Sequence, residues 1–241
     1  MYRKEEFHSN TLDIHGTAHR QPGRSARSED PVLHHLKSFA RKVFKNARGS
    51  HDWDHTRRVA GLCERIGAAE GADMFILMGA AYLHDIGRCE QDAARGSLCH
   101  AESGAAKAKP FVNDLPISDR QKENILHCIT SHRFRGKATP QTIEAKVLFD
   151  ADKLDAIGAI GVARAYLFAG ELGARLHNPD MDVHEARSYS RNDTGYREYV
   201  VKLCKIKDRM LTVSGLRMAQ ERHEYMVQFF NRFLDEYEAK R

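Results

Sequence analysis

The stretch FILMGAAYLHDIGRC, residues 75–89, decides how the rest of the chain is interpreted. Its first nine residues are largely apolar, which predicts a helix buried on every side. A polar couple, His84 and Asp85, ends this run. A carboxylate carried into an apolar interior has to be neutralised, paired or bound to a metal, because an unpaired buried charge is very costly. Gly87 follows the couple, where a helix C-terminal glycine is expected.

The composition around this stretch fits one globular domain. The chain has 241 residues, of which 41% are hydrophobic and 29% are charged, values typical of a protein with one substantial core. A formal net charge of +5 suits a small anionic substrate such as a phosphate. No basic stripe of the kind found in nucleic-acid binders is visible, so we expect no nucleic-acid partner.

The cysteines and the apolar runs indicate where in the cell the protein acts. The five cysteines form no CxxC motif, and an odd number argues against a disulfide framework. Reduced thiols are typical of the cytoplasm, where we expect the protein to act. No apolar run is long enough to span a membrane, and the N-terminus lacks the apolar core of a signal peptide.

Apolar residues recur at helical spacing through most of the chain, and no strand-like alternation of any length interrupts them. Gly, Pro and Asn mark the joints, and Asp52 or Ser50 can cap the second helix. We therefore predict one all-α domain over residues 31–241, preceded by a mobile extension at 1–30. The long polar loop 174–196 is predicted to be flexible or to cover a substrate. Helices are expected at about 31–47, 53–72, 73–86, 99–111, 117–133, 140–157, 158–172, 196–211 and 215–239.

Histidines and acids stand on several of these predicted helices rather than on one. They are His55, the couple His84-Asp85, His100, His132, and the acids Asp150, Asp152 and Asp155. A metal site inside a helical bundle is built in this way, from side chains that project inward from facing helices. Imidazole and carboxylate donors suit Mn, Fe, Co, Ni or Zn, and suit Mg less well. Asp150 and Asp152 point about 200° apart on a helix, so only one of them can face the metal.

Three segments in this order resemble the HD superfamily of metal-dependent phosphohydrolases, and the fit is best to the stand-alone bacterial members. They are HDWDHTRRV at 51–59, LHDIGR at 83–88 and FDADKLDAIGAIGVAR at 149–164. The resemblance extends over about residues 31–235 and implies an all-α HD-domain bundle with a divalent metal in its interior. It places the metal ligands at His55, His84, Asp85 and Asp152. His51 is a poorer match than His55, and Asp150 is the competitor of Asp152.

The same resemblance extends to residues around the metal. Some HD relatives use two further histidines, which fall here on His100 and His132 as second-metal or phosphate ligands. Basic side chains have to hold the phosphoryl oxygens, because charge stabilisation provides most of the catalysis. The substrate-binding candidates are Arg58, His100, His132, Lys153 and Arg164, while Arg88 and Arg133 lie beside predicted helix ends. The catalytic candidates are Asp85, Asp155 and Lys153. His127 is expected to be structural.

The resemblance implies an enzyme that hydrolyses a small phosphate-containing substrate, with a nucleotide as the leading candidate. Nucleoside triphosphate pyrophosphohydrolysis and nucleotidase activity are the two forms considered. A second enzyme class keeps the fold, because HD-fold di-iron oxygenases use a six-ligand set of the kind these residues would make. A third possibility is an inactive nucleotide-sensing module. Cyclic-dinucleotide phosphodiesterases are a weaker match, since SHRFRGKATP at 131–140 lacks their GYP element. A homodimer is compatible with all of these.

Overall fold

The computed structural model describes residues 30–44, 52–93, 98–133 and 138–241, and these residues form helices and no strand. The predicted all-α class is therefore confirmed. The predicted mobile extension lies, apart from Asp30, outside the described residues. In chain order the helices are α1 (Pro31–Val43), α2 (Trp53–Glu70), α3 (Met74–Leu83), α4 (Arg88–Ala93), α5 (His100–Asn113), α6 (Asp119–Ser131), α7 (Ile143–Asp155), α8 (Gly158–Glu171), α9 (Gly195–Val201), the 3-10 helix η2 (Leu203–Arg209) and α10 (Val213–Tyr237).

Short polar side chains begin most of these helices. The Asp52 carboxylate accepts a hydrogen bond from the backbone N–H of His55 at the start of α2, as predicted, and Asp73 accepts from two N–H groups at the start of α3. Ser118 and Gln121 form a reciprocal capping box at α6. Each cap satisfies backbone donors that have no partner inside the helix. These caps fix where α2 begins, and His55 lies in its first turn.

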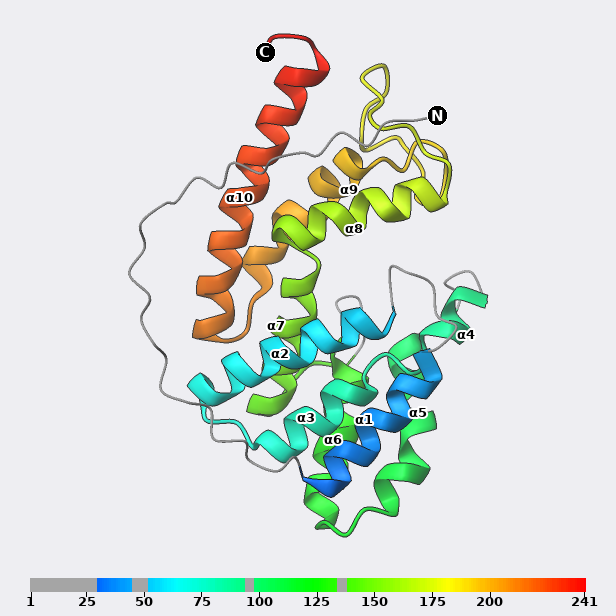
Figure 1. The fold of residues 1–241 in the computed structure, drawn as a ribbon, viewed down its shortest axis with the longest axis vertical. Helices are drawn as coiled ribbons and strands as arrows, with labels where there is room; N and C mark the ends of the chain where they lie inside the picture. Colours follow the sequence, from blue (N-terminus) through cyan, green and yellow to red (C-terminus); the bar gives the residue numbers. More distant parts are fainter. Residues whose placement is uncertain (1–29, 45–51, 94–97, 134–137) are drawn as a thin grey trace, which may run out of the picture.

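The core is built around α3, and α7 connects it to the C-terminal helices. Residues Ile76–Leu83 of α3 are all buried, and the helix packs against α1, α2, α6 and α7. Figure 1 shows α1, α3, α5 and α6 gathered in one half of the molecule and α8, α9 and α10 in the other, with α7 reaching between them. The N-terminal end of α2, the C-terminal end of α3 and the C-terminal end of α7 can therefore meet in the interior.

The turn after α3 differs from the prediction. The helix ends at Leu83, so His84 caps it and Asp85 lies in the following turn instead of within a helix that reaches residue 86. Gly87 does not adopt a left-handed cap conformation. It is required because α5 passes so close that a Cβ atom at this position would overlap the His100 carbonyl and would lie 2.5 Å from the Gly104 nitrogen. The short helix α4, which follows directly, was not predicted.

The segment predicted as one helix at 196–211 is broken. At Lys202 the backbone leaves helical geometry (φ −138°), which separates α9 from η2. All five cysteines are free, as predicted. Within the described residues, no helix combines the length and the apolar character needed to cross a membrane.

Candidate metal centre

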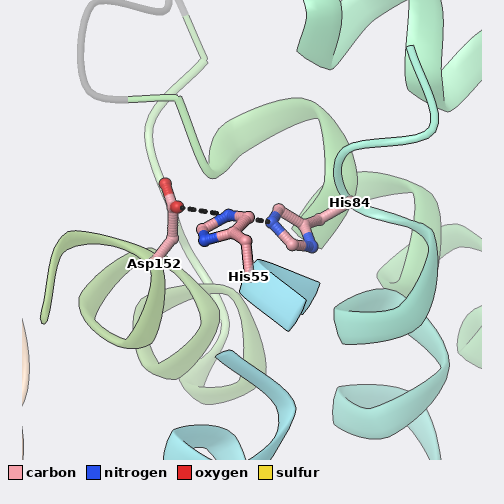
Figure 2. Close-up of side chains that lie close together, drawn as sticks. All are labelled: His55, His84 and Asp152. Carbon is pink, nitrogen blue, oxygen red and sulfur yellow. Dashed lines mark hydrogen bonds and ion pairs between the residues drawn. The ribbon is translucent and has the colours of Figure 1, made fainter. Parts of the chain in front are cut away.

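His55 and His84 approach each other from α2 and from the end of α3. The Nδ1 atom of His84 lies 2.8 Å from the Ala81 carbonyl oxygen, and Nδ1 of His55 lies 2.7 Å from Oδ2 of Asp155. Because both partners are acceptors, each Nδ1 carries the proton and each Nε2 presents a lone pair. The two Nε2 atoms face each other at 3.4 Å (Figure 2). Two Nε2 lone pairs at that distance repel each other unless one nitrogen is protonated or a metal cation lies beside them.

His100 and His132 repeat this arrangement. Nδ1 of His100 lies 2.5 Å from Oε1 of Gln91, and Nδ1 of His132 lies 2.6 Å from the Ile129 carbonyl oxygen. Their Nε2 atoms are 3.1 Å apart, and both histidines are almost fully buried. The second pair therefore presents two more lone pairs that the described protein atoms do not satisfy.

The Asp85 carboxylate lies between the two histidine pairs. Its Oδ2 atom is 3.5 Å from Nε2 of His55 and 3.8 Å from Nε2 of His84. Its Oδ1 atom is 3.4 Å from Nε2 of His100 and 3.5 Å from Nε2 of His132. One oxygen thus belongs to each pair, so this side chain can serve both.

Asp152 approaches the first pair from α7. Its Oδ1 atom lies 3.4 Å from Nε2 of His55, and Figure 2 shows this carboxylate and the two imidazoles pointing toward one another. Its Oδ2 atom accepts a hydrogen bond of 2.6 Å from Nζ of Lys153, which also donates to the His132 carbonyl oxygen at 2.7 Å. Lys153 therefore neutralises one carboxylate oxygen and leaves the other directed at the histidines.

Asp155 lies on the opposite side of the His55 ring. Besides His55 Nδ1, it accepts hydrogen bonds from Arg58 Nε at 2.6 Å, Arg58 NH2 at 3.0 Å and Arg164 NH1 at 2.9 Å. These contacts direct both arginines, which we expected to hold the substrate, toward a buried carboxylate. A carboxylate behind a metal-binding histidine fixes the ring and its tautomer.

Asp150 is placed away from this cluster. Its carboxylate accepts hydrogen bonds from the backbone N–H groups of Leu211 and Thr212 and from the Thr212 hydroxyl, at 2.7–3.1 Å. Burial raises the pKa of this carboxyl above its ordinary value, although the hydrogen bonds from Thr212 and Leu211 act in the opposite direction. Of the two competing acids, Asp152 therefore lies with the histidines and Asp150 anchors the start of α10. His127 accepts from the Gln141 N–H, a structural contact.

The electrostatics of the cluster call for a positive charge. Burial disfavours a proton on His55, but the carboxylates of Asp152, Asp155 and Asp85 outweigh that effect and raise its pKa to about 10. Burial lowers the pKa of His84 to about 4. Burial opposes ionisation of Asp85 and Asp152 as well, yet Arg88 and Lys153 respectively are among the charges that hold their pKa values well below the ordinary range. A divalent cation would supply the charge that the proton on His55 otherwise provides.

These donors form two overlapping groups that can hold a metal ion. One comprises His55, His84 and Asp152, the other His84, Asp85 and His132, and within each group the donor atoms lie within 4.8 Å of one another. Imidazole nitrogen with carboxylate oxygen is a donor set that suits divalent transition metals. The residues present therefore fit a divalent cation.

Comparison with known proteins identifies the family. A family model of the HD domain matches residues 52–157. The protein YpgQ of Bacillus subtilis is 35% identical over 199 residues, which cover 80% of this chain and 88% of YpgQ. The chain belongs to the HD-domain family.

Two solved structures of HD-domain relatives resemble the whole described fold. The crystal structure of B. subtilis YpgQ in complex with ADP matches with a TM-score of 0.65 and 31% identity, over 85% of this chain and 94% of that one. An HD-superfamily hydrolase from Bacillus thuringiensis matches with a TM-score of 0.67 and 29% identity, over 86% of this chain and 97% of that one. The similarity therefore includes the C-terminal helices that lie outside the family model.

A cavity of about 320 Å³ opens beside the candidate metal centre of this HD-domain protein. His100, Asp152 and Lys153 line it, together with side chains from α8, η2 and the loop before α9. Ser188 and Tyr189 lie at its wall, so the loop predicted to cover a substrate does contribute to the cavity. The cations that line it are Arg88, Arg133, Lys153, Arg164 and Lys202, against the acids Asp152, Asp193 and Glu198.

Most of these cations already have carboxylate partners. Arg88 contacts Asp85, and Lys202 contacts Glu198. Arg133 differs, because its side chain forms no ion pair or hydrogen bond with the described part of the chain. The sequence predicted only that Arg133 lies beside a helix end, and its neighbouring residues in the chain do not distinguish it from other surface arginines.

Proposed function

We propose that this protein is a metal-dependent phosphohydrolase that acts on a nucleotide. The observation that carries the proposal is the juxtaposition of four buried imidazoles, whose Nε2 lone pairs face each other across Asp85, with a cation-lined cavity. The first feature suits a divalent metal, and the second suits a phosphorylated substrate. Membership of the HD-domain family supports the hydrolase class.

His55, His84, Asp85 and Asp152 would hold the principal ion. His100 and His132, with the second oxygen of Asp85, form a separate donor group, and we propose that it holds a second ion or a phosphoryl oxygen. A divalent ion supplies water of lowered pKa and polarises a phosphoryl oxygen. Mn, Fe, Co, Ni and Zn match the donors better than Mg does.

The remaining roles concern protons and charge. Asp155 keeps the proton on Nδ1 of His55, which leaves Nε2 as the donor. Lys153 binds one oxygen of Asp152 and so fixes the direction of the other. The Asp85 carboxylate lies within 3.8 Å of all four Nε2 atoms, and we propose it as the acceptor of the proton that water loses.

Arg133 is the proposed contact for the substrate phosphates. It lines the cavity together with His100 and Lys153, and no carboxylate among the described residues neutralises it. A guanidinium that no carboxylate neutralises can bind a phosphate through two parallel hydrogen bonds. Arg58 and Arg164, which the sequence suggested for this role, act instead through Asp155, although Arg164 also lines the cavity.

The nucleotide is supported by a relative, since YpgQ has been crystallised in complex with ADP. We propose nucleoside triphosphate pyrophosphohydrolysis as the leading reaction, with nucleotidase activity as the second form. Five free cysteines suit the reducing cytoplasm as its location. The expected lack of nucleic-acid binding and the homodimer remain predictions.

One observation favours a second candidate function. Asp85 lies between two histidine pairs, and a carboxylate so placed is also compatible with the six-ligand set of an HD-fold di-iron oxygenase. Anaerobic assays separate the two classes, because hydrolysis needs no oxygen. An inactive nucleotide sensor would bind nucleotide without turnover, and the complete donor set speaks against it.

Product analysis tests the proposal. Nucleoside mono-, di- and triphosphates are each incubated with Mn²⁺-loaded protein, and phosphate and pyrophosphate are detected separately. Pyrophosphate together with the monophosphate, formed from a triphosphate, indicates cleavage of the bond between the α- and β-phosphates, and phosphate alone indicates a phosphatase or nucleotidase. Absence of both products, from protein shown to contain metal, would contradict the proposed function.

A further inference from the structure

Tyr189 adopts a costly backbone conformation at the wall of the cavity. Its φ angle of 60° is in the left-handed region, which a bulky side chain rarely occupies. Such a conformation persists only where its surroundings hold it. Here the Tyr189 N–H donates to Oδ2 of Asp193 at 2.7 Å, and the other Asp193 oxygen accepts from the buried Arg197 at 2.7 Å. Arg197 also donates to the Ala186 carbonyl oxygen, which ties down the preceding part of the loop.

This anchored backbone presents an aromatic ring instead of burying it. The Tyr189 side chain is 67% exposed. Its ring meets the half-buried ring of Phe168, on α8, at a centroid distance of 5.5 Å and an interplanar angle of 86°. An edge-on contact is a favourable arrangement of two aromatic rings, and the high exposure of Tyr189 leaves much of its surface available to a ligand. Both side chains line the same cavity as Asp152 and Arg133.

The cavity therefore has two kinds of lining. Its metal-side residues include cations suited to phosphate, and its loop side provides an aromatic pair, Tyr189 and Phe168. A nucleotide carries the same two features, a phosphate chain and an aromatic base. We propose that the aromatic pair is a stacking surface for the base of the bound nucleotide, an inference that rests on the proposed function.

The chemistry of stacking limits which substrates the pair selects. Every base has a π-face, so a stacked ring favours nucleotides over phosphate esters that lack an aromatic group and discriminates weakly among bases. The specificity that follows is for the nucleotide class. Tyr189 is thus a specificity-determining residue, and the metal centre does not depend on it.

Two substitutions separate the ring from the backbone. Tyr189→Asn removes the ring but keeps a residue that tolerates the left-handed conformation. Tyr189→Phe keeps the ring and removes the hydroxyl. Tyr225→Asn is the matched control, because this exposed tyrosine also lies against a phenylalanine, Phe229, but does not line the cavity. All variants are compared by thermal unfolding before binding is measured.

Binding of ADP and of pyrophosphate to the Mn²⁺-loaded protein is measured by calorimetry. Loss of a base–aromatic stack corresponds to about fivefold or more in affinity. We expect Tyr189→Asn to weaken ADP binding by at least that factor and to leave pyrophosphate binding unchanged, with Tyr189→Phe and Tyr225→Asn close to the native protein. Equal loss for ADP and pyrophosphate, no loss for either, or no binding of ADP by the native protein would overturn the stacking surface. ADP binding that depends on Tyr189 in a protein without turnover would instead overturn the proposed function alone.

Discussion

Replacing Asp155 with asparagine tests how the metal centre is oriented. The carboxylate accepts four hydrogen bonds, from His55, from Arg58 twice and from Arg164, at 2.6–3.0 Å. Asparagine has nearly the same size but only one accepting atom. Whichever way the amide turns, its NH2 group faces at least one N–H donor. The substitution therefore removes the negative charge behind His55 and breaks at least one of these bonds.

The expected loss of metal affinity is about tenfold, or ~1.4 kcal/mol. Removal of a group that orients a metal-binding histidine typically costs 10- to 100-fold in affinity. We expect the smaller, tenfold loss of metal affinity because of the pKa of His55, which carboxylates including Asp155 raise to about 10. A metal ion has to displace the proton that His55 binds at this pKa. Removing Asp155 makes that proton easier to displace, which offsets part of the loss of metal affinity.

Competition with a chelator measures the effect, using Mn²⁺ and protein freed of metal. Asp208→Asn is the matched control, since it removes one negative charge from an exposed ion pair with Lys207 outside the cluster. Thermal unfolding of the metal-free variants separates a folding defect from a metal-binding defect. If the Mn²⁺ affinities of Asp155→Asn and Asp208→Asn are both within twofold of that of the native protein, Asp155 does not orient the metal-binding histidine and the prediction is wrong.

Four further predictions follow from other contacts. Arg133→Gln should lower kcat/KM for a nucleotide about tenfold, because a charged phosphate contact is lost; an unchanged value would remove this residue from the site. Asp150→Ala should lower the free energy of unfolding by about 2–3 kcal/mol, since buried N–H groups lose their acceptor, and should leave metal binding intact; loss of the metal would shift the ligand assignment by two residues. Gly87→Ala should reduce stability by about 1–3 kcal/mol, because the added methyl overlaps the backbone of α5; an unchanged midpoint in denaturant would contradict that contact. Acidification should destabilise the metal-free protein, because the folded pKa values of His84 and His100 are about 4 and about 3 against an ordinary 6.5. The unfolded chain then binds more protons below pH 6.5, and stability falls there by up to about 1.4 kcal/mol per pH unit for each histidine; a flat profile between pH 5 and 6.5 would contradict this.

Local patterns in the sequence predicted most of the helices, and the resemblance to the HD superfamily supplied the acids and histidines of the proposed metal site. The apolar run of α3 indicates a buried helix, and the carboxylate of the His84-Asp85 couple at its end has to be neutralised, paired or bound to a metal. Spacing along α7 allows only one of Asp150 and Asp152 to face the histidines, and the structure places Asp152 there. These features depend on residues close together in the chain.

Features that depend on distant packing were not accessible in the same way. Gly87 looks like a helix cap in the sequence, but its real constraint is the approach of α5. Arg58 looks like a phosphate ligand until Asp155, on another helix, is found to accept both of its hydrogen bonds. Tyr189 is an ordinary loop residue until its φ angle and its contact with Phe168 are known. In each case the deciding neighbour is remote in sequence.

Metal-dependent turnover of a nucleoside triphosphate is the most direct test of the account. The native protein and Asp152→Ala are freed of metal, shown to be folded, and assayed for pyrophosphate and phosphate release before and after addition of Mn²⁺. We predict no turnover without metal, restored turnover in the native protein, and none in the variant. Turnover that survives metal removal, or that Asp152→Ala retains, would contradict the proposed metal centre, and no turnover by metal-loaded native protein would contradict the proposed activity.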